Sequence, residues 1–143
     1  MIFSRESLEQ CLADIQVLLE DHHRDVGEKI RLDPDFEVYR QMEPSLRIYT
    51  ARREGLLIGY AAFIVCATNL HHKGLKSAAN DALYVKPACR GITGSRLMAY
   101  AETALKDEGI QVVTLHVPKS NDWTPLALKW GYEVIETHVR KTL

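Results

Sequence analysis

The segment from Asp81 to Met98 constrains the fold of this chain more than any other stretch. Its residues, DALYVKPACRGITGSRLM, are typical of a buried strand, a turn with Pro87, a loop with two glycines and an amphipathic helix. A helix N-terminus leaves backbone N–H groups without intrahelical partners, and the helix dipole adds partial positive charge there. Gly91 and Gly94 let a phosphate approach this backbone closely. The segment therefore predicts a binding site for a phosphate-bearing ligand.

Two common phosphate-binding loops do not fit this segment. A P-loop requires a Lys directly after its last glycine, and no Lys follows either glycine here. A dinucleotide-binding loop requires the spacing G-x-G-x-x-G, which the two glycines also lack. The segment instead resembles the central motif of the GNAT superfamily of acyl-CoA-dependent N-acetyltransferases, L-x-V-x-P-x-x-R-G followed by a glycine-rich turn and a helix. The matching residues are Leu83, Val85, Pro87, Arg90, Gly91, Gly94, Ser95 and Leu97.

The loop itself departs from the family pattern, which is Q/R-x-x-G-x-G/A. Counted from Arg90, Thr93 and Ser95 stand where the family has glycines, whereas a loop one residue shorter aligns Gly94 with the last glycine. In this family backbone amides make most of the contacts with the phosphates, so the departure bears on the details of the loop. The shorter loop also looks like that of a subgroup met in bacteriophage and prophage proteins.

Two flanking segments extend the resemblance to about residues 46–140. Residues 56–65 resemble the central strand of the family, and residues 115–132 resemble its later strand, Asn-led helix and Gly-Tyr start of the last strand. The resemblance implies one α/β (α+β) domain, residues 1–143. Its central sheet is expected to be mixed and mostly antiparallel, with helices on both faces and two splayed central strands.

The resemblance further implies that acetyl-CoA, as co-substrate, binds between the splayed strands, which end near Val85 and Val117. Backbone groups of the first strand would bond the pantetheine arm, and amides of the glycine loop would hold the pyrophosphate. The Val85 N–H would face the thioester oxygen, and losing such a donor typically removes about 3 kcal/mol of transition-state stabilisation. The predicted coenzyme-binding residues are Leu83, Tyr84, Val85, Arg90, Gly91, Ile92, Thr93, Gly94, Ser95 and Asn121.

The acceptor amine must lose a proton before it attacks, because an alkylamine is mostly protonated at pH 7. Asp81 lies four residues before Val85, so on a regular strand the two side chains would share a face. His116 lies on the neighbouring predicted strand, and His72 lies on the loop that leads into the Asp81 strand. These three residues are the predicted candidates for the catalytic base.

The general acid of many family members, a Tyr about seven residues after the position of Asn121, is replaced here by Leu128. Either the thiolate leaves unaided or another group protonates it. Three functions therefore stay open. The first is an N-acetyltransferase that acts on a primary amine by direct attack, the second is a non-catalytic acyl-CoA-binding sensor or interaction module, and the third is a phage-type protein that modifies a host macromolecule. The acceptor is a small-molecule or protein amine, and the acidic residues between His22 and Pro44 suit a cationic one.

Composition narrows the classes of partner and the location. The formal net charge is −1, which does not indicate binding to nucleic acid or to a membrane surface. The sequence shows no signal peptide and no apolar run of the length that spans a bilayer, so we expect a cytoplasmic protein, and exposed strand edges allow a homodimer. Three cysteines without close pairs do not predict disulfides. The pairs His22-His23 and His71-His72 lack further ligands at metal-binding spacing, so no metal is predicted.

Periodicity predicts the remaining elements. A capping box at Ser7 and Gln10 begins a helix that runs to about residue 20, and a second helical piece covers residues 22–30. Asp33-Pro34 begins a short helix that Pro44 ends. The later elements are predicted as strands at 46–51, 57–66, 80–85, 111–117 and 132–139, and helices from the glycine loop to Gly109 and at 124–130.

Overall fold

Five strands form one mixed sheet in the order β1-β2-β3-β4-β5, in a computed structural model that describes residues 1–143. The strands from β1 to β4 pair antiparallel, and β4 pairs parallel with β5. The predicted mixed, mostly antiparallel sheet is therefore confirmed. The strands are β1 (Ile2–Glu6), β2 (Leu46–Arg53), β3 (Leu56–Cys66), β4 (Ser77–Val85) and β5 (Val112–Thr114).

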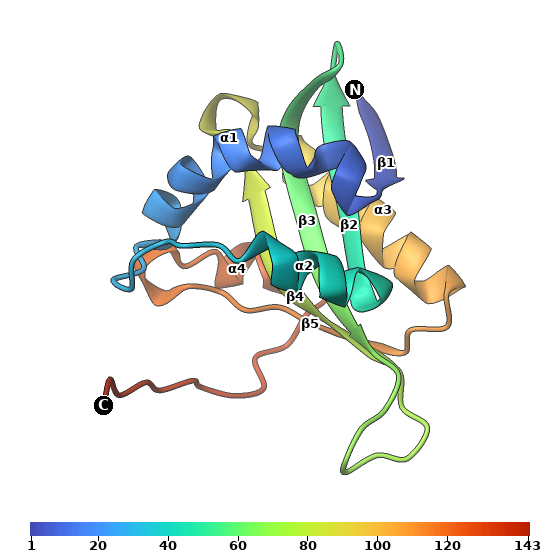
Figure 1. The fold of residues 1–143 in the computed structure, drawn as a ribbon. Helices are drawn as coiled ribbons and strands as arrows, with labels where there is room; N and C mark the ends of the chain where they lie inside the picture. Colours follow the sequence, from blue (N-terminus) through green and yellow to red (C-terminus); the bar gives the residue numbers. More distant parts are fainter.

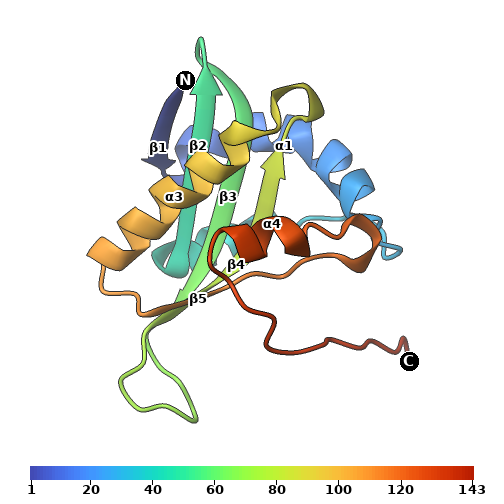
Figure 2. The same ribbon diagram turned by 180° about the vertical axis from the view of Figure 1, so that it is seen from behind.

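Helices cover both faces of this sheet, as predicted (Figures 1 and 2). One face carries α1 (Leu8–Val26) and α2 (Phe36–Met42), and the other carries α3 (Ile92–Asp107) and α4 (Thr124–Lys129). Three short 3-10 turns, η1 (Glu43–Ser45), η2 (Pro87–Cys89) and η3 (Lys119–Asn121), join these elements. None of the helices is both long and apolar enough to cross a membrane.

The core divides between the two faces because side chains alternate along each strand. On the α3 face, Leu97, Met98 and Leu105 are fully buried against Tyr49 and Phe63 of the sheet. On the α1 face, smaller clusters join Leu8, Cys11 and Leu18 to residues of β2, β3 and β4. The sheet is thus packed on both sides, which fixes the course of β4, the strand next to the edge strand β5.

The structure corrects the prediction for the N-terminal third. The capping box at Ser7 and Gln10 is present, but α1 runs without interruption to Val26 and is capped by Gly27. Gly27 therefore ends one long helix and does not lie inside a second one. The short helix begins after the N-cap Asp35, slightly later than predicted. Strand β1 was not predicted, because five residues next to the N-terminus carry little periodic signal.

The largest error concerns residues 132–139, which do not form the predicted strand. No helix or strand follows Lys129, and this segment runs away from the sheet (Figures 1 and 2). Val134, Ile135 and Val139 are 70%, 66% and 93% exposed. A strand needs a neighbour to pair its backbone groups, and here β5 contributes only three residues as the edge of the sheet. The apolar residues indicated a strand but could not reveal that its partner is so short.

Glu6 connects β1 to β2 through a partly buried ion pair. The Arg52 guanidinium donates from Nε and Nη2 to the two Glu6 carboxylate oxygens at 2.8 and 2.9 Å. The Thr50 hydroxyl donates to the same carboxylate. These hydrogen bonds, with Arg52 the strongest cause, hold the pKa of Glu6 below its usual value although burial acts in the opposite direction.

We expect the protein to lose stability in acid through Glu6. A carboxyl group with a lowered pKa in the folded state stabilises the fold fully above about pH 5, and this contribution disappears as the pH falls through the folded-state pKa. Glu6→Gln should therefore flatten the fall in unfolding free energy below that pH, measured by urea unfolding at several pH values. Glu9→Gln, an exposed change on α1, is the matched control. An acid slope as steep in Glu6→Gln as in wild type would contradict the assignment.

Candidate active site

Strands β4 and β5 part after a short parallel ladder. The paired residues are Ser77 with Val112, Ala78 with Val113 and Ala79 with Thr114. Beyond this point β4 continues to Val85, whereas the chain after Thr114 leaves the sheet without forming a strand. One edge of β4 is therefore free of a neighbouring strand from residue 80 onward. This is the splay that the fold prediction required, although it lies at the edge of the sheet.

The hydrogen bonds with β3 decide which groups face this free edge. The Lys86 N–H donates to the Ile58 carbonyl at 2.9 Å, and Tyr84 lies opposite Tyr60 in the same register. Because antiparallel strands alternate between bonded and non-bonded pairs, the main-chain groups of Tyr84 face β3. Those of Leu83 and Val85 face away from β3, toward the open edge.

The predicted phosphate loop lies directly beyond this edge. Gly91 is the N-cap of α3, with φ 94° and ψ −122°, and no side chain caps the helix. Ile92, Thr93 and Gly94 follow it in the first turn, so their amides and that of Gly91 are the N–H groups that lack intrahelical partners, whereas the Ser95 N–H lies four residues after the N-cap and pairs with the Gly91 carbonyl. Gly94 lies inside the helix, whereas the sequence analysis placed it in the loop. A Cβ atom there would meet only Val85 Cγ2, at 4.0 Å, so the turn lies against the end of β4.

The Arg90 side chain turns back toward the protein. Its Nε donates to the Val85 carbonyl at 2.9 Å, and its guanidinium pairs with Asp25 of α1. The guanidinium also lies over the Tyr84 ring, 5.9 Å from the centroid. The backbone N–H of Arg90 donates to the Pro87 carbonyl. Both the amide and the side chain of Arg90 thus have protein partners, and the side chain joins the end of α1 to the end of β4.

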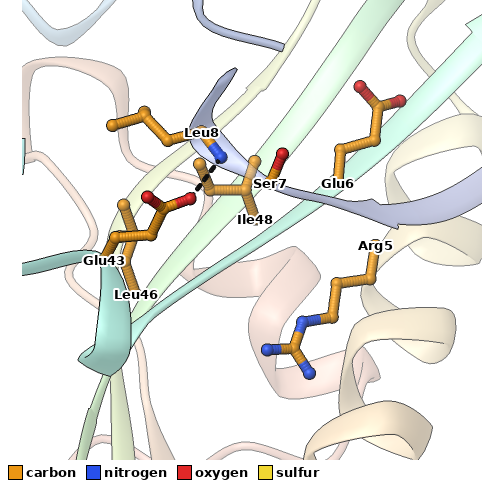
Figure 3. A pocket seen from close by; sticks show the side chains of 7 residues that line it. All are labelled: Arg5, Glu6, Ser7, Leu8, Glu43, Leu46 and Ile48. Carbon is orange, nitrogen blue, oxygen red and sulfur yellow. Dashed lines mark hydrogen bonds between the residues drawn. The ribbon is translucent and has the colours of Figure 1, made fainter. Parts of the chain in front are cut away.

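The open edge and the helix N-terminus face one cleft of about 1280 Å³. Its walls come from the end of α1, β4, the start of α3, the chain after β5, η3 and α4. This volume is large enough for a coenzyme-sized ligand. A second hollow, of about 270 Å³, lies where β1 and α1 meet η1 (Figure 3). It contains the Glu43 carboxylate, which accepts the Leu8 N–H at 2.9 Å and so caps α1.

Asp81 lies in the cleft, but not on the predicted face. The register between β3 and β4 shifts at this point, so that Asn80 pairs with Phe63, Ala82 pairs with Ala62 and Asp81 has no partner. This β-bulge turns Asp81 toward α2, where the Tyr39 hydroxyl donates to Asp81 Oδ2 at 3.2 Å. Val85 and Asp81 therefore do not share a face, because a bulge interrupts the period of two.

The surroundings of Asp81 favour its protonated form more than water does. The carboxyl group keeps access to the open cleft, but surrounding protein displaces water and raises its pKa above the usual value. The hydrogen bond from Tyr39 acts in the opposite direction and is the weaker of the two causes. A carboxyl group with a raised pKa is a stronger base once it ionises.

The other two base candidates are placed differently. His116 lines the cleft but lies just after β5, and its ring packs against His138 at 5.4 Å between centroids. His72 lies in the exposed loop between β3 and β4, outside the residues that line the cleft. This loop projects from the end of the sheet opposite the glycine turn (Figure 1). The structure thus brings Asp81 and His116 together in the cleft and leaves His72 apart.

Asn121 lies in η3 and lines the cleft. The cap of α4 comes from its neighbour, since Asp122 Oδ1 accepts the Thr124 N–H at 2.9 Å. Asn121 is therefore not needed for helix capping. It lines the same cleft as β4, and its contact with the coenzyme arm stays a prediction.

His22 is a residue of the cleft that the sequence analysis did not assign to the site. Its Nδ1 lies 2.7 Å from the Tyr60 hydroxyl oxygen, and its ring stacks on Tyr84 at 5.1 Å. Burial, the largest cause, lowers the pKa of His22 and favours the neutral ring. The sequence did carry a signal, because His22 follows the buried Leu18 by four residues on one helix.

Most acidic residues of the 22–44 region and its flank already have cationic or capping partners. Asp35 caps α2 by accepting the Glu37 N–H. No cluster of three or more His, Cys, Asp or Glu side chains is placed to hold a metal ion. Asp81, which has only the neutral Tyr39 as a hydrogen-bond partner, is therefore a carboxylate without a cationic partner in the cleft. The ion pairs are Asp21 with Arg24, Asp25 with Arg90, Glu28 with Arg140 and Glu37 with Arg40.

Solved acetyltransferase structures share this fold. An aminoglycoside acetyltransferase from an uncultured soil metagenomic sample, in complex with trehalose, is 18% identical and has a TM-score of 0.78 over 99% of this chain and 95% of its own. A predicted acetyltransferase from Clostridium acetobutylicum, solved with acetyl-CoA, is 15% identical with a TM-score of 0.78 over the same shares. A ribosomal-protein-alanine N-acetyltransferase from Brucella melitensis is 15% identical, with a TM-score of 0.75 over 99% of this chain and 100% of its own.

No curated protein sequence matches the chain. The sequence model of the acetyltransferase (GNAT) family, in contrast, matches residues 15–132. That range contains the free edge of β4, the glycine turn and the first turn of α3. With the match covering most of its length and the fold in agreement, the chain belongs to the acetyltransferase (GNAT) family.

Proposed function

We propose that this protein is an acetyl-CoA-dependent N-acetyltransferase that transfers an acetyl group to a primary amine by direct attack. The observation that carries this proposal is the free edge of β4, which ends at the uncapped N-terminus of α3. An extended arm pairs with a free strand edge, and a helix N-terminus binds phosphate. The two features meet in one cleft, in the order in which coenzyme A carries these groups.

In this proposal the amides of Ile92 to Gly94 bind the pyrophosphate, with Gly91 setting the turn. The main-chain groups of Leu83 and Val85 bind the pantetheine arm, and an N–H of this edge faces the thioester oxygen. Such a preorganised donor stabilises the negative charge that develops as the carbonyl is attacked. Because Arg90 already donates to the Val85 carbonyl, an arm that uses this oxygen must share it or displace Arg90. Tyr84 contributes through its side chain, since its main chain faces β3.

Two protons leave the attacking nitrogen, because an alkylamine is mostly protonated at pH 7. A base takes the first proton, the neutral amine then bonds to the thioester carbon, the carbon–sulfur bond breaks, and the nitrogen gives its second proton to solvent. We assign the role of the base to the Asp81 carboxylate, which lies in the cleft and has a raised pKa, with His116 as the second candidate. The thiolate leaves unaided and takes its proton from solvent. Leu128 offers no proton, and the Tyr132 hydroxyl already donates to Glu102 at 2.7 Å.

The acceptor is a primary amine of a small molecule or a protein. Structural neighbours include proteins named for aminoglycosides and for ribosomal-protein alanine, and both names describe amine acceptors. Since the nearby acidic residues of α1 and α2 are largely paired, Asp81 is the group that would attract a cationic acceptor. The cytoplasmic location, a homodimer and the kinship with phage proteins stay predictions from the sequence.

Binding of acetyl-CoA is the first test. At a concentration of 100 times its dissociation constant, the ligand should raise the unfolding free energy by about 2.7 kcal/mol. A thermal-shift experiment with acetyl-CoA, coenzyme A and ATP should show stabilisation by the first two and a smaller effect of ATP. Release of free thiol with a panel of amines then measures turnover. Absence of any shift with acetyl-CoA contradicts the proposal.

The replacement of the usual phenol by Leu128 favours one alternative, a protein that binds acyl-CoA without turnover. The two functions give different results in the same experiments. Both predict stabilisation by acetyl-CoA. Only the enzyme releases thiol when a suitable amine is added, so binding without release across cationic, neutral and anionic amines would favour the alternative.

A further inference from the structure

Asn80 stands at the point where β4 and β5 part. The last paired residues are Ala79 and Thr114, and Asn80 is the next residue of β4. Its side-chain Oδ1 accepts the backbone N–H of His116. The residue is only 9% exposed and is one of three buried polar residues of the protein. A buried amide in this position has a defined partner and joins the two diverging chains.

This hydrogen bond replaces a rung of the parallel ladder. The register pairs residues that differ by 35, so a continued ladder would place Asp81 opposite His116. The His116 N–H would then donate to a main-chain carbonyl of β4. Instead a side chain lies between the two backbones, and the chain after Thr114 is held farther from β4 than strand pairing allows.

The bulge at Asp81 cannot produce this arrangement alone. It turns the backbone of β4, but it supplies no acceptor for the His116 N–H, which lies beside a buried residue. Backbone N–H groups in such positions need partners. Since a backbone N–H is the donor, the atom that faces it must be Oδ1 and not Nδ2. The position therefore requires a side chain that can accept a hydrogen bond at this length.

We propose that Asn80 is a positioning residue of the acyl-transfer site, which ends the β4–β5 ladder and holds the groove open for the coenzyme arm. This inference rests on the proposed function, because it concerns the same groove. Asn80 lines the cleft beside Asp81 and would set how far the arm can enter. The chemical group that matters is the acceptor oxygen.

Two substitutions of nearly equal size separate the acceptor from the volume. Asn80→Leu removes the acceptor, so the His116 N–H must either pair with the β4 main chain, which closes the groove, or exchange with solvent. We expect the affinity for acetyl-CoA to fall about tenfold, equal to about 1.4 kcal/mol. Asn80→Asp keeps an oxygen in place and should retain the affinity. The affinity is measured and not the transfer rate, because the carboxylate added in Asn80→Asp lies next to Asp81, the proposed base.

Hydrogen exchange of the His116 amide in the free protein gives a readout that does not need the coenzyme. The His116 amide should exchange slowly in wild type and in Asn80→Asp. In Asn80→Leu its exchange should be faster, while the Phe63 amide in the core stays protected in all three proteins. Asn69 provides matched controls, because its Oδ1 also accepts backbone N–H groups, from His71 and His72, but outside the cleft. Asn69→Leu should leave acetyl-CoA affinity unchanged.

The outcomes distinguish the two proposals. If wild type does not bind acetyl-CoA, the proposed function fails, and the exchange experiment still decides whether Asn80 holds His116. If wild type binds and Asn80→Leu binds equally well, the positioning role of Asn80 is overturned while the proposed function stands. Weaker binding in Asn80→Asp and Asn80→Leu alike would also overturn it, because the acceptor oxygen would then not be the determining group.

Discussion

Asp81→Asn is expected to reduce acetyl transfer about 100-fold or more, which is the usual range for removing a general base. The substitution keeps the shape of the side chain and its hydrogen bond from Tyr39, but the amide cannot take a proton. The affinity for acetyl-CoA should not change, because the proposed coenzyme contacts lie on the main chain of β4 and the first turn of α3. Thiol release at saturating acetyl-CoA and amine measures the effect.

The pH dependence identifies the role more sharply than the rate alone. Transfer should fall as the pH decreases through the raised pKa of Asp81, because only the ionised carboxylate accepts a proton. Tyr39→Phe removes a hydrogen bond that lowers this pKa, so the acid limb should move to higher pH. Asp107→Asn, at the far end of α3, should leave the profile unchanged. If Asp81→Asn keeps full activity, Asp81 is not the base and His116 becomes the residue to test.

Gly91→Ala is expected to weaken acetyl-CoA binding by tenfold or more, that is, by at least about 1.4 kcal/mol. At φ 94° and ψ −122° an alanine is strained by about 1–3 kcal/mol. A Cβ atom would meet no atom within 4 Å, so the effect comes from the backbone and not from a clash. The turn must relax, and the amides that follow it then no longer point at one pyrophosphate. Calorimetric titration with acetyl-CoA measures this loss.

Gly109→Ala provides the control at the other end of the same helix. Gly109 also has a positive φ, 86°, and open space around its Cβ position, but it does not line the cleft. Both substitutions should lower the unfolding free energy, and only Gly91→Ala should lower the coenzyme affinity. Equal affinities for the two variants would mean that the geometry of the glycine turn does not matter for binding.

The strand, turn and helix around the glycine loop could be predicted because each depends on local rules. Pro87, the glycine N-cap and the apolar period of α3 are all visible in the sequence. The splay also followed, although only through the family resemblance. Its physical cause, the pairing of Asn80 with His116, joins residues that are far apart in the chain, and no local pattern indicates such a contact.

The side of the sheet on which the Asp81 side chain lies and the role of His22 could not be predicted, for a related reason. A strand period of two holds only while the register is regular, and the bulge at Asp81 depends on how β3 and β4 pair. His22 becomes part of the site because Tyr60 and Tyr84 lie beneath it. Both features arise from tertiary packing. The sequence therefore predicted which residues form the edge, but not which way every side chain on it points.

The order of the strands has a consequence for the folding of the chain. Strands β2, β3 and β4 follow one another and pair as neighbours, and Glu54 and Gly55 alone form the turn between β2 and β3. Such local contacts close with little loss of chain entropy and favour early assembly. In contrast, β1 and β5 must each reach a partner across intervening helices. The β4–β5 ladder, at whose end the cleft opens, is thus among the contacts of this sheet that form last. The antiparallel β-meander of β2, β3 and β4 can form before the cleft exists.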